Sequence, residues 1–344
     1  MSNSTNRSVK ISLDVLQASI ILPMMDKYML IVLYIGGMLG SLLNIFTFRQ
    51  RKFRKNSCSL YFLSASITDF FVMNAVLMMD ALRYLNSSLF NLINSSRIGC
   101  KLGKYLIYLL PCLSSTFITL ACIDRFCTSS YNSRLRKLSQ LKVSRILISL
   151  VVLIWVVFSI HITFLFDILP PTPAKSDPCR SPSNVFQLSL IIDGYFFSMY
   201  NGAIVPLLLL IFGLLIHRNV RLSRRRIAAT SNITSNRTII ATRNPNLNRH
   251  NLHLITMLLI QSIVTVILNI PYMTVALYGF YNNAPTDQML LLLYIIFVYI
   301  ARWFWFSNYV KTFYINTLSS EIFRNTLIQL FIDISDQMRV RIQQ

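Results

Sequence analysis

The amino-acid sequence predicts an all-α fold, a seven-transmembrane helix bundle with the N-terminus outside the cell. Three observations predict it: an apolar composition, apolar blocks as long as a membrane is thick, and basic residues concentrated in alternate loops. Hydrophobic residues make up 54% of the 344 residues and charged residues only 13%, against roughly 25% charged in soluble domains. A soluble fold could not bury that much apolar surface, so the lipid bilayer is the expected solvent.

The apolar residues form seven blocks, each close to or above the roughly 20 residues that a helix needs to cross the hydrocarbon layer. The blocks cover residues 28–48, 57–80, 102–127, 144–167, 190–216, 253–280 and 289–313. No repeat relates the two halves of the chain, which argues against a transporter built from inverted repeats. We therefore expect an extracellular tail at 1–27, a seven-helix domain at 28–317 and a cytosolic segment at 318–344.

The distribution of Lys and Arg sets the predicted orientation. Segments on the side of the N-terminus hold nine basic residues, those on the opposite side hold 23, and Arg302 lies within the last span. By the positive-inside rule, the N-terminus faces out and the C-terminus faces the cytosol. The candidate glycosylation sites on the outer side are Asn3, Asn6, Asn86 and Asn94. Two further triplets, at Asn232 and Asn236, fall in an inner loop and are expected to stay unmodified.

Two segments on the inner side carry further signals. Residues 218–251 are rich in Arg, Asn, Thr and Ser, which predicts a flexible cytosolic loop that contacts anionic lipid, a cytosolic partner or both. Residues 319–331 place Ile322, Phe323 and Leu327 on one side of a helix. This pattern predicts a short amphipathic eighth helix on the inner leaflet, with a soluble tail helix as the alternative.

Composition and motifs exclude several classes of protein. The formal charge of +21 is spread over short loops rather than over one basic face, so membrane lipid is the expected partner and nucleic acid is not. The sequence has no CxxC pair, no Cys/His cluster, no nucleophile–base pair and no phosphate-binding loop, so no enzyme, zinc site or organic cofactor is expected.

The third block links the two faces of the membrane. Cys100 and Arg125 are 25 residues apart, which corresponds to about 37 Å along one helix. Cys179 falls in the outer loop that follows the fourth block, in an oxidising compartment. We therefore expect a disulfide between Cys100 and Cys179 that ties this loop to the third helix; two free thiols are the alternative.

Residues in six of the blocks resemble the anchor positions of the rhodopsin-like (class A) G protein-coupled receptors, in the expected order. The anchors are Asn44, the stretch 64–69, Cys100, Asp124-Arg125-Phe126, Trp155, Pro206 and Pro271. The resemblance implies a multi-pass receptor of the plasma membrane that transmits binding of an extracellular ligand to a heterotrimeric G protein, with arrestin as a further partner.

Asp124, Arg125 and Phe126 resemble the Asp-Arg-Tyr motif of this family. The resemblance implies that Arg125 meets the G protein when the sixth helix swings outward. A basic residue that reaches toward lipid headgroups is the alternative. The adjacent Asp124, which can hold the arginine in the resting state, favours the switch.

Asp69 lies near the middle of the membrane, where an unpaired charge is costly. The resemblance implies a polar network of Asn44, Asp69, Ser114, Asn308 and Thr312, in which Asp69 holds an allosteric sodium ion. The alternative is a protonated Asp69 that donates a hydrogen bond to Asn44 or Asn308 and joins the helices.

The sixth and seventh helices depart from the family. Thr312-Phe313-Tyr314-Ile315-Asn316 stands where Asn-Pro-x-x-Tyr is expected, so both the proline and the tyrosine are missing. Asn269 replaces the usual tryptophan two residues before Pro271, and Leu214 replaces a tyrosine in the fifth helix. The fold and topology do not depend on these residues, but the family's activation relay does.

The outer half of the bundle is the expected ligand site. Its residues are Asp80, Lys104, Ile107, Tyr108, Asp193, Asn269, Tyr272, Tyr299 and Arg302. Phe306 replaces the retinal lysine of opsins, and Ile107 replaces the aspartate of amine receptors. For Arg302 we favour a structural pair with Asp80 over direct contact with a ligand carboxylate.

The mixture of charges and aromatic rings favours a peptide ligand, and the resemblance leans toward the neuropeptide branch through Phe313-Tyr314 and Leu318-Ser319-Ser320. Two other functions stay open. A non-signalling decoy or scavenger receptor would fit the altered seventh helix. A transporter or channel would use Asp69 and Arg302 to line a pathway.

Overall fold

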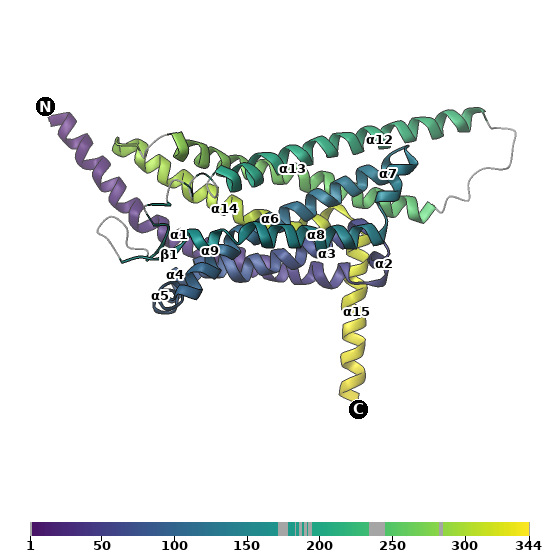
Figure 1. The fold of residues 1–344 in the computed structure, drawn as a ribbon, viewed down its shortest axis with the longest axis horizontal. Helices are drawn as coiled ribbons and strands as arrows, with labels where there is room; N and C mark the ends of the chain where they lie inside the picture. Colours follow the sequence, from purple (N-terminus) through teal and green to yellow (C-terminus); the bar gives the residue numbers. More distant parts are fainter. Residues whose placement is uncertain are drawn as a thin grey trace.

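The computed structural model is a bundle of long helices with the two ends of each helix at opposite faces (Figure 1). The structure describes residues 2–170, 178–182, 184–185, 188, 191, 195–233, 245–281 and 285–343. Within these residues, seven helices are long and apolar enough to cross a membrane. Their spans overlap the seven predicted blocks, so the predicted bundle is confirmed.

Several of the seven crossings are built from more than one helical segment. The first is α1 (Ser2–Phe48), and the second is α3 (Ser57–Val72), η1 (Met73–Leu77) and α4 (Met78–Leu85). The third is α6 (Arg97–Ser129), and the fourth is α8 (Leu141–Ser159) and α9 (Ile162–Leu165). The fifth is α11 (Phe197–Met199), η3 (Tyr200–Ile204) and α12 (Val205–Ile233). The sixth is α13 (Pro245–Tyr281), and the seventh is α14 (Gln288–Ser319).

Shorter elements connect these crossings. They are α2 (Arg51–Arg54), α5 (Ser87–Asn94), α7 (Ser133–Leu138), β1 (Asp167–Ile168), β2 (Cys179–Arg180) and the C-terminal α15 (Glu321–Gln343). The π-helical segments η1 and η3 each insert a wider turn into a membrane helix, a feature common near functional sites. α6 packs against α3, α8 and α12, which places it at the centre of the bundle.

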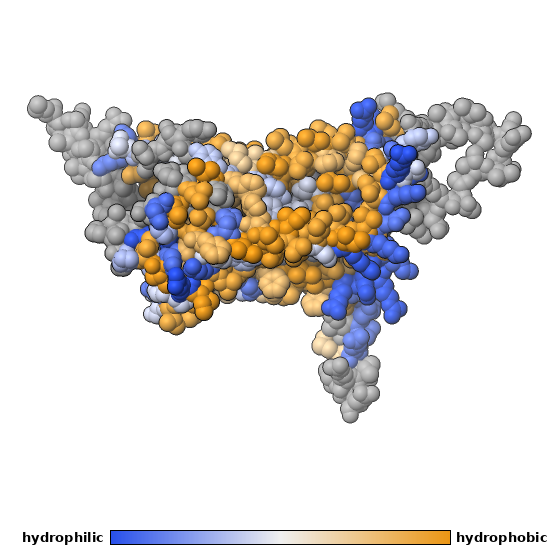
Figure 2. Space-filling model, viewed as in Figure 1, coloured by the Kyte–Doolittle hydropathy of each residue, from blue (hydrophilic) through white to orange (hydrophobic). Residues whose placement is uncertain are grey.

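On the face shown in Figure 2, apolar residues cover the middle of the bundle and hydrophilic residues gather toward both ends. Large apolar side chains are exposed; Ile146, Leu153 and Val157 on α8 are 67%, 59% and 58% exposed. An exposed apolar surface of this extent requires lipid around it.

Three helices extend into segments that the sequence predicts as tail or loop. α1 covers the whole of 2–27, α12 continues to Ile233, and α13 begins at Pro245. Residues 218–233 contain neither Gly nor Pro, so nothing in them ends the helix. Pro245 stands at the first position of α13, where a proline fits because its missing N–H would have no partner.

A small hairpin covers the outer end and is the exception to the all-α expectation. β1 and β2 pair antiparallel, with Ile168 opposite Cys179. Cys179 forms a disulfide with Cys100 of α6, as predicted, with the two Cα atoms 5.5 Å apart. Arg97 adds a bidentate ion pair to Asp167 at 2.8 Å, and its hydrogen bonds lower the pKa of the Asp167 carboxyl.

Phenylalanine side chains hold the inner ends of several helices together. Phe323 of α15 is fully buried, and its ring lies 5.3 Å from Phe48, 6.3 Å from Phe53 and 6.2 Å from Phe313. Beyond this anchor, α15 runs across the axis of the bundle (Figure 1). The turns of α15 that follow Phe323 expose the side chain of Phe331, which is 52% accessible. A helix that lies on the inner leaflet exposes apolar side chains in this way.

We expect Phe323→Ala to lower the free energy of unfolding by roughly 3 to 5 kcal/mol, because it removes a ring packed against three others. Phe331→Ala on the same helix is the matched control and should change it by less than about 0.5 kcal/mol. Thermal melting of the purified protein in detergent measures both. Equal effects of the two substitutions would contradict the proposed anchor.

Candidate functional site

α6 carries one candidate functional group at each depth of the membrane. Its first turn is capped by Ser96, whose hydroxyl accepts from the Gly99 amide. Cys100 follows at the outer end, Ser114 lies in the middle, and Asp124 and Arg125 occupy the inner end. Cys100 and Arg125, whose 25-residue spacing predicted a single helix, therefore do lie on one continuous helix.

Arg125 is buried and bound to Asp124. Its Nη2 donates to Asp124 Oδ2 at 2.6 Å and its Nε to the same oxygen at 3.2 Å. Both side chains are 3% exposed. Such a buried pair is costly to break, because separation leaves a charge without a partner in a medium of low polarity.

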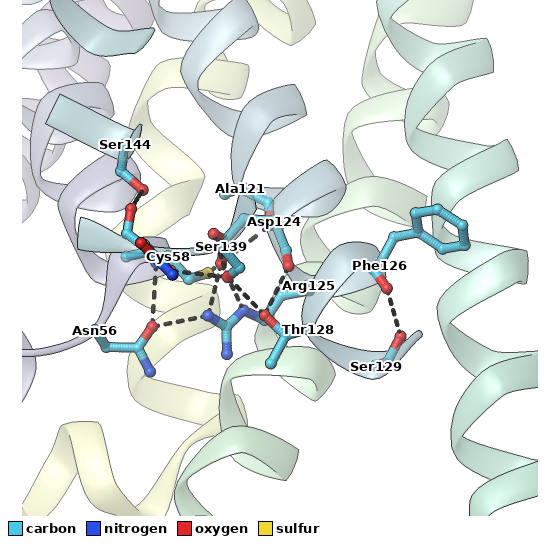
Figure 3. A network of polar contacts seen from close by, with 12 residues as sticks. Asn56, Cys58, Ala121, Asp124, Arg125, Phe126, Thr128, Ser129, Ser139 and Ser144 are labelled. Atoms are coloured by element: carbon cyan, nitrogen blue, oxygen red, sulfur yellow. Dashed lines mark hydrogen bonds and ion pairs between the residues drawn. The ribbon is translucent and has the colours of Figure 1, made fainter. Parts of the chain in front are cut away.

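Asn56 and Ser139 complete this inner cluster, and sequence analysis missed both. Asn56 caps α3, so its Oδ1 accepts from the Cys58 amide and from Arg125 Nη2, at 3.1 and 2.8 Å. Ser139 ends α7 and donates to Asp124 Oδ1 at 2.6 Å. Figure 3 shows Asn56 beside the Arg125 guanidinium and Ser139 close to Asp124. The signal that could have identified Asn56 is its position as a helix-capping residue between a basic run and an apolar block.

Phe126 does not belong to this cluster. Its ring points away from Arg125 (Figure 3) and contacts Phe212 of α12, with the ring centroids 5.6 Å apart. Asn219, about two turns further along α12, donates to Ser129 at 3.2 Å. The third and fifth helices are thus joined beside the arginine.

The middle of the bundle holds Asp69, which is 2% exposed and accepts from the Ser114 hydroxyl. Lys311 of α14 lies in the same region. Its Nζ donates to the backbone oxygen of Asn308 at 2.7 Å and to Asn308 Oδ1 at 2.9 Å. Ser114, Asn308, Lys311 and Thr312 all line one cavity of about 30 Å³. The count of basic residues had assigned Lys311 to the inner side, although it falls within the seventh block. The structure places it inside the bundle on α14, and an excess of basic residues on the inner side remains.

The expected polar network divides into two parts. Asn44 is not hydrogen-bonded to Asp69 within the described residues but accepts from Asn316 Nδ2 at 3.3 Å. Asn316 Oδ1 in turn accepts from Gln261 of α13 at 2.9 Å. Asn316 occupies the register of the family's missing tyrosine, and here it joins the first, sixth and seventh helices.

A charged cluster lies at the outer end. Arg302 of α14 contacts two carboxylates, Asp80 at 3.0 Å and Asp26 at 3.2 Å. Asp26 is fully buried and also accepts from Tyr84 at 2.9 Å and from Trp303 at 2.7 Å. The favoured Asp80–Arg302 pair is therefore present. Asp26 is a second partner of Arg302, which sequence analysis missed because it had assigned residues 1–27 to an extracellular tail.

The other predicted pocket residues lie at different depths. Tyr108 contacts Phe197, Tyr272 stacks on Trp305 at 5.9 Å, and Tyr299 lies beside Trp303. Lys104 Nζ lies 5.4 Å from the centre of the Phe166 ring, and Ile107 is partly buried against the core. Asn269 instead accepts from Asn308 at 3.2 Å and lines the middle cavity. Asp193 lies outside the described residues.

Two of the candidate glycosylation sites can be placed. Asn86 is exposed and caps α5, with its side-chain oxygen accepting from the Leu89 amide. Asn94 is partly buried at the end of the same helix. The side chains of Asn3 and Asn6 and of the inner-loop triplets fall outside the described part of the chain.

The family described as 7 transmembrane receptor (rhodopsin family) matches residues 40–327. The chain therefore belongs to this family of multi-pass, non-enzymatic membrane receptors, for which membership implies ligand-activated G protein signalling. A search of curated proteins gives no match to the chain.

We expect Arg302→Met to lower the free energy of unfolding by roughly 3 kcal/mol, because it leaves the buried Asp26 without its cation. Adding Asp26→Asn to this variant should recover stability, since no buried charge is then unpaired. Thermal melting of the two variants, of Asp26→Asn alone and of the unaltered chain completes the cycle. Simple additivity of the two single substitutions would contradict the pairing.

Proposed function

We propose that this chain is a plasma-membrane receptor that binds an extracellular peptide and activates a heterotrimeric G protein through Arg125. Family membership supports the signalling class, whereas the peptide ligand and the residue roles are our proposals. The observation that carries the proposal is the Arg125 side chain, buried at the inner end of α6 and held there by Asp124.

The contacts of Arg125 in the resting state suit a switch, because the arginine can exchange its partners for others but cannot be left without any. Arg125 is bound by a carboxylate on its own helix and by the Asn56 cap of α3. Asp124 keeps its own bond from Ser139 when the arginine leaves. An incoming G protein segment that offers acceptor oxygens replaces the partners that Arg125 gives up, so the charge is never without a partner.

The altered sixth and seventh helices imply a different relay from that of most family members. We propose that the Gln261–Asn316–Asn44 contacts, in place of a proline and tyrosine, couple the sixth helix to the first and seventh. Of the two hydrogen bonds that link these three amides, only the one between Gln261 and Asn316 joins α13 to α14. A movement of α13 therefore breaks this bond first.

A peptide is the ligand that the outer half suits best. Charged groups of both signs lie there: Asp80, 28% exposed at its side chain, pairs with Arg302, and Lys104 lies over the Phe166 ring. Mixed charges with aromatic rings match the backbone and side chains of a peptide. Ile107 offers no carboxylate to an amine. Arrestin is proposed as a second cytosolic partner on the same inner face.

The test applies a library of synthetic peptides, and separately of biogenic amines, to cells that express the chain, with nucleotide exchange on a panel of Gα subunits as the readout. A peptide agonist should raise exchange and the amines should not. Arg125→Ala should abolish the response while surface expression and binding of the labelled agonist persist. Arg145→Ala, an exposed inner-end arginine on α8, is the control and should respond normally.

Asp124→Asn gives a second expected outcome that needs no ligand. Removing the carboxylate weakens the hold on Arg125, so ligand-independent exchange should rise several-fold at equal surface expression. A normal agonist response in Arg125→Ala, or unchanged basal exchange in Asp124→Asn, would contradict the assigned switch.

The same cells distinguish the competing functions. Uptake of a bound peptide with no exchange on any Gα subunit would support the decoy receptor. Solute or ion flux through the reconstituted protein that is lost in Asp69→Asn would support a transporter or channel.

A further inference from the structure

Lys311 is a cationic side chain within the membrane-spanning part of α14. It lies one residue before Thr312 and two turns beyond Phe304 in the same helix. An ammonium group inside a bundle requires a partner or a polar cavity. Two of its three N–H donors are bound by Asn308, one by the backbone oxygen and one by Oδ1.

The nearby acid is Asp69 of α3. The charges of Asp69 and Lys311 act on each other, although their atoms do not form a direct ion pair. Ser114, which bonds Asp69, lines the same cavity as Lys311. The cavity of about 30 Å³ is large enough to hold an ordered water. The Lys311 ammonium therefore lines a small polar cavity beside Ser114, the serine that donates a hydrogen bond to the Asp69 carboxylate.

The residues at this site do not fit the sodium ion that the family resemblance implies. A hard cation needs several oxygen ligands, and here Asn308 offers both of its oxygens to Lys311. A sodium ion would also add a second positive charge beside a single carboxylate.

We propose that the Lys311 ammonium is the built-in counter-ion of Asp69, that it replaces sodium at this site, and that the resting receptor is therefore insensitive to sodium. The rival account is that the flexible lysine side chain reaches toward the inner headgroups and leaves Asp69 to a sodium ion. This inference concerns the resting fold and does not depend on the ligand or on the proposed G protein role.

The experiment measures the melting temperature of the purified full-length receptor in about 0.15 M sodium chloride and in choline chloride of equal ionic strength. The unaltered chain should melt at the same temperature in both salts. Lys311→Met keeps the length of the side chain but removes its charge. It should acquire a sodium-specific rise of about 2 °C or more, because sodium now binds the folded state.

Asp69→Asn added to Lys311→Met should abolish the acquired sodium response, since the carboxylate is the principal ligand. Lys137→Met, at an exposed lysine of α7, should behave like the unaltered chain. Lys311→Gln replaces Lys311→Met if the methionine variant does not fold. A sodium-specific stabilisation of the unaltered chain overturns the proposal, and so does the lack of any sodium response in both Lys311 variants.

Discussion

The low polarity of the membrane interior is the constraint on which this structure depends, because it requires every charged side chain within the bundle to have a partner. The described chain meets it at three depths. Asp26 and Asp80 bind Arg302 near the outer end, and Asp124 binds Arg125 at the inner end. In the middle, Asp69 accepts a hydrogen bond from Ser114, which lines the same cavity as Lys311 of α14. Each cluster also joins helices that are distant in the sequence.

We propose that the clusters give the receptor a fixed outer end and a switchable inner end. The outer cluster includes a fully buried acid with three donors, and the nearby disulfide fixes the outer loop to α6. The inner pair is bound by neighbours that keep other partners when the arginine leaves. Binding energy from the outer face can therefore shift the inner end without unfolding the bundle.

Sequence analysis recovered what local patterns encode and missed what depends on register between helices. Hydropathy blocks gave the seven crossings, and the resemblance to the family's Asp-Arg-Tyr motif gave Asp124 and Arg125. Sequence analysis missed Asp26 because this residue falls within the expected tail. No Gly and no second Pro in that segment marks where the membrane-spanning part of α1 begins. Lys311 was counted with the basic residues of the inner side because it stands near the inner end of the seventh apolar block. Asn316 bonds helices that are far apart in the sequence, and no spacing rule predicts such a pair.

The claim that supports the whole account is that α6 crosses the entire membrane, with Cys100 outside and Arg125 inside. Single cysteines introduced at exposed positions on either side, Asn91→Cys in α5 and Ser133→Cys in α7, test it directly. The native free cysteines are buried and Cys100 and Cys179 are bonded to each other, so the background is low. A membrane-impermeant maleimide should label Asn91→Cys in intact cells and Ser133→Cys only after permeabilisation. Labelling of both from the same side would contradict the receptor topology.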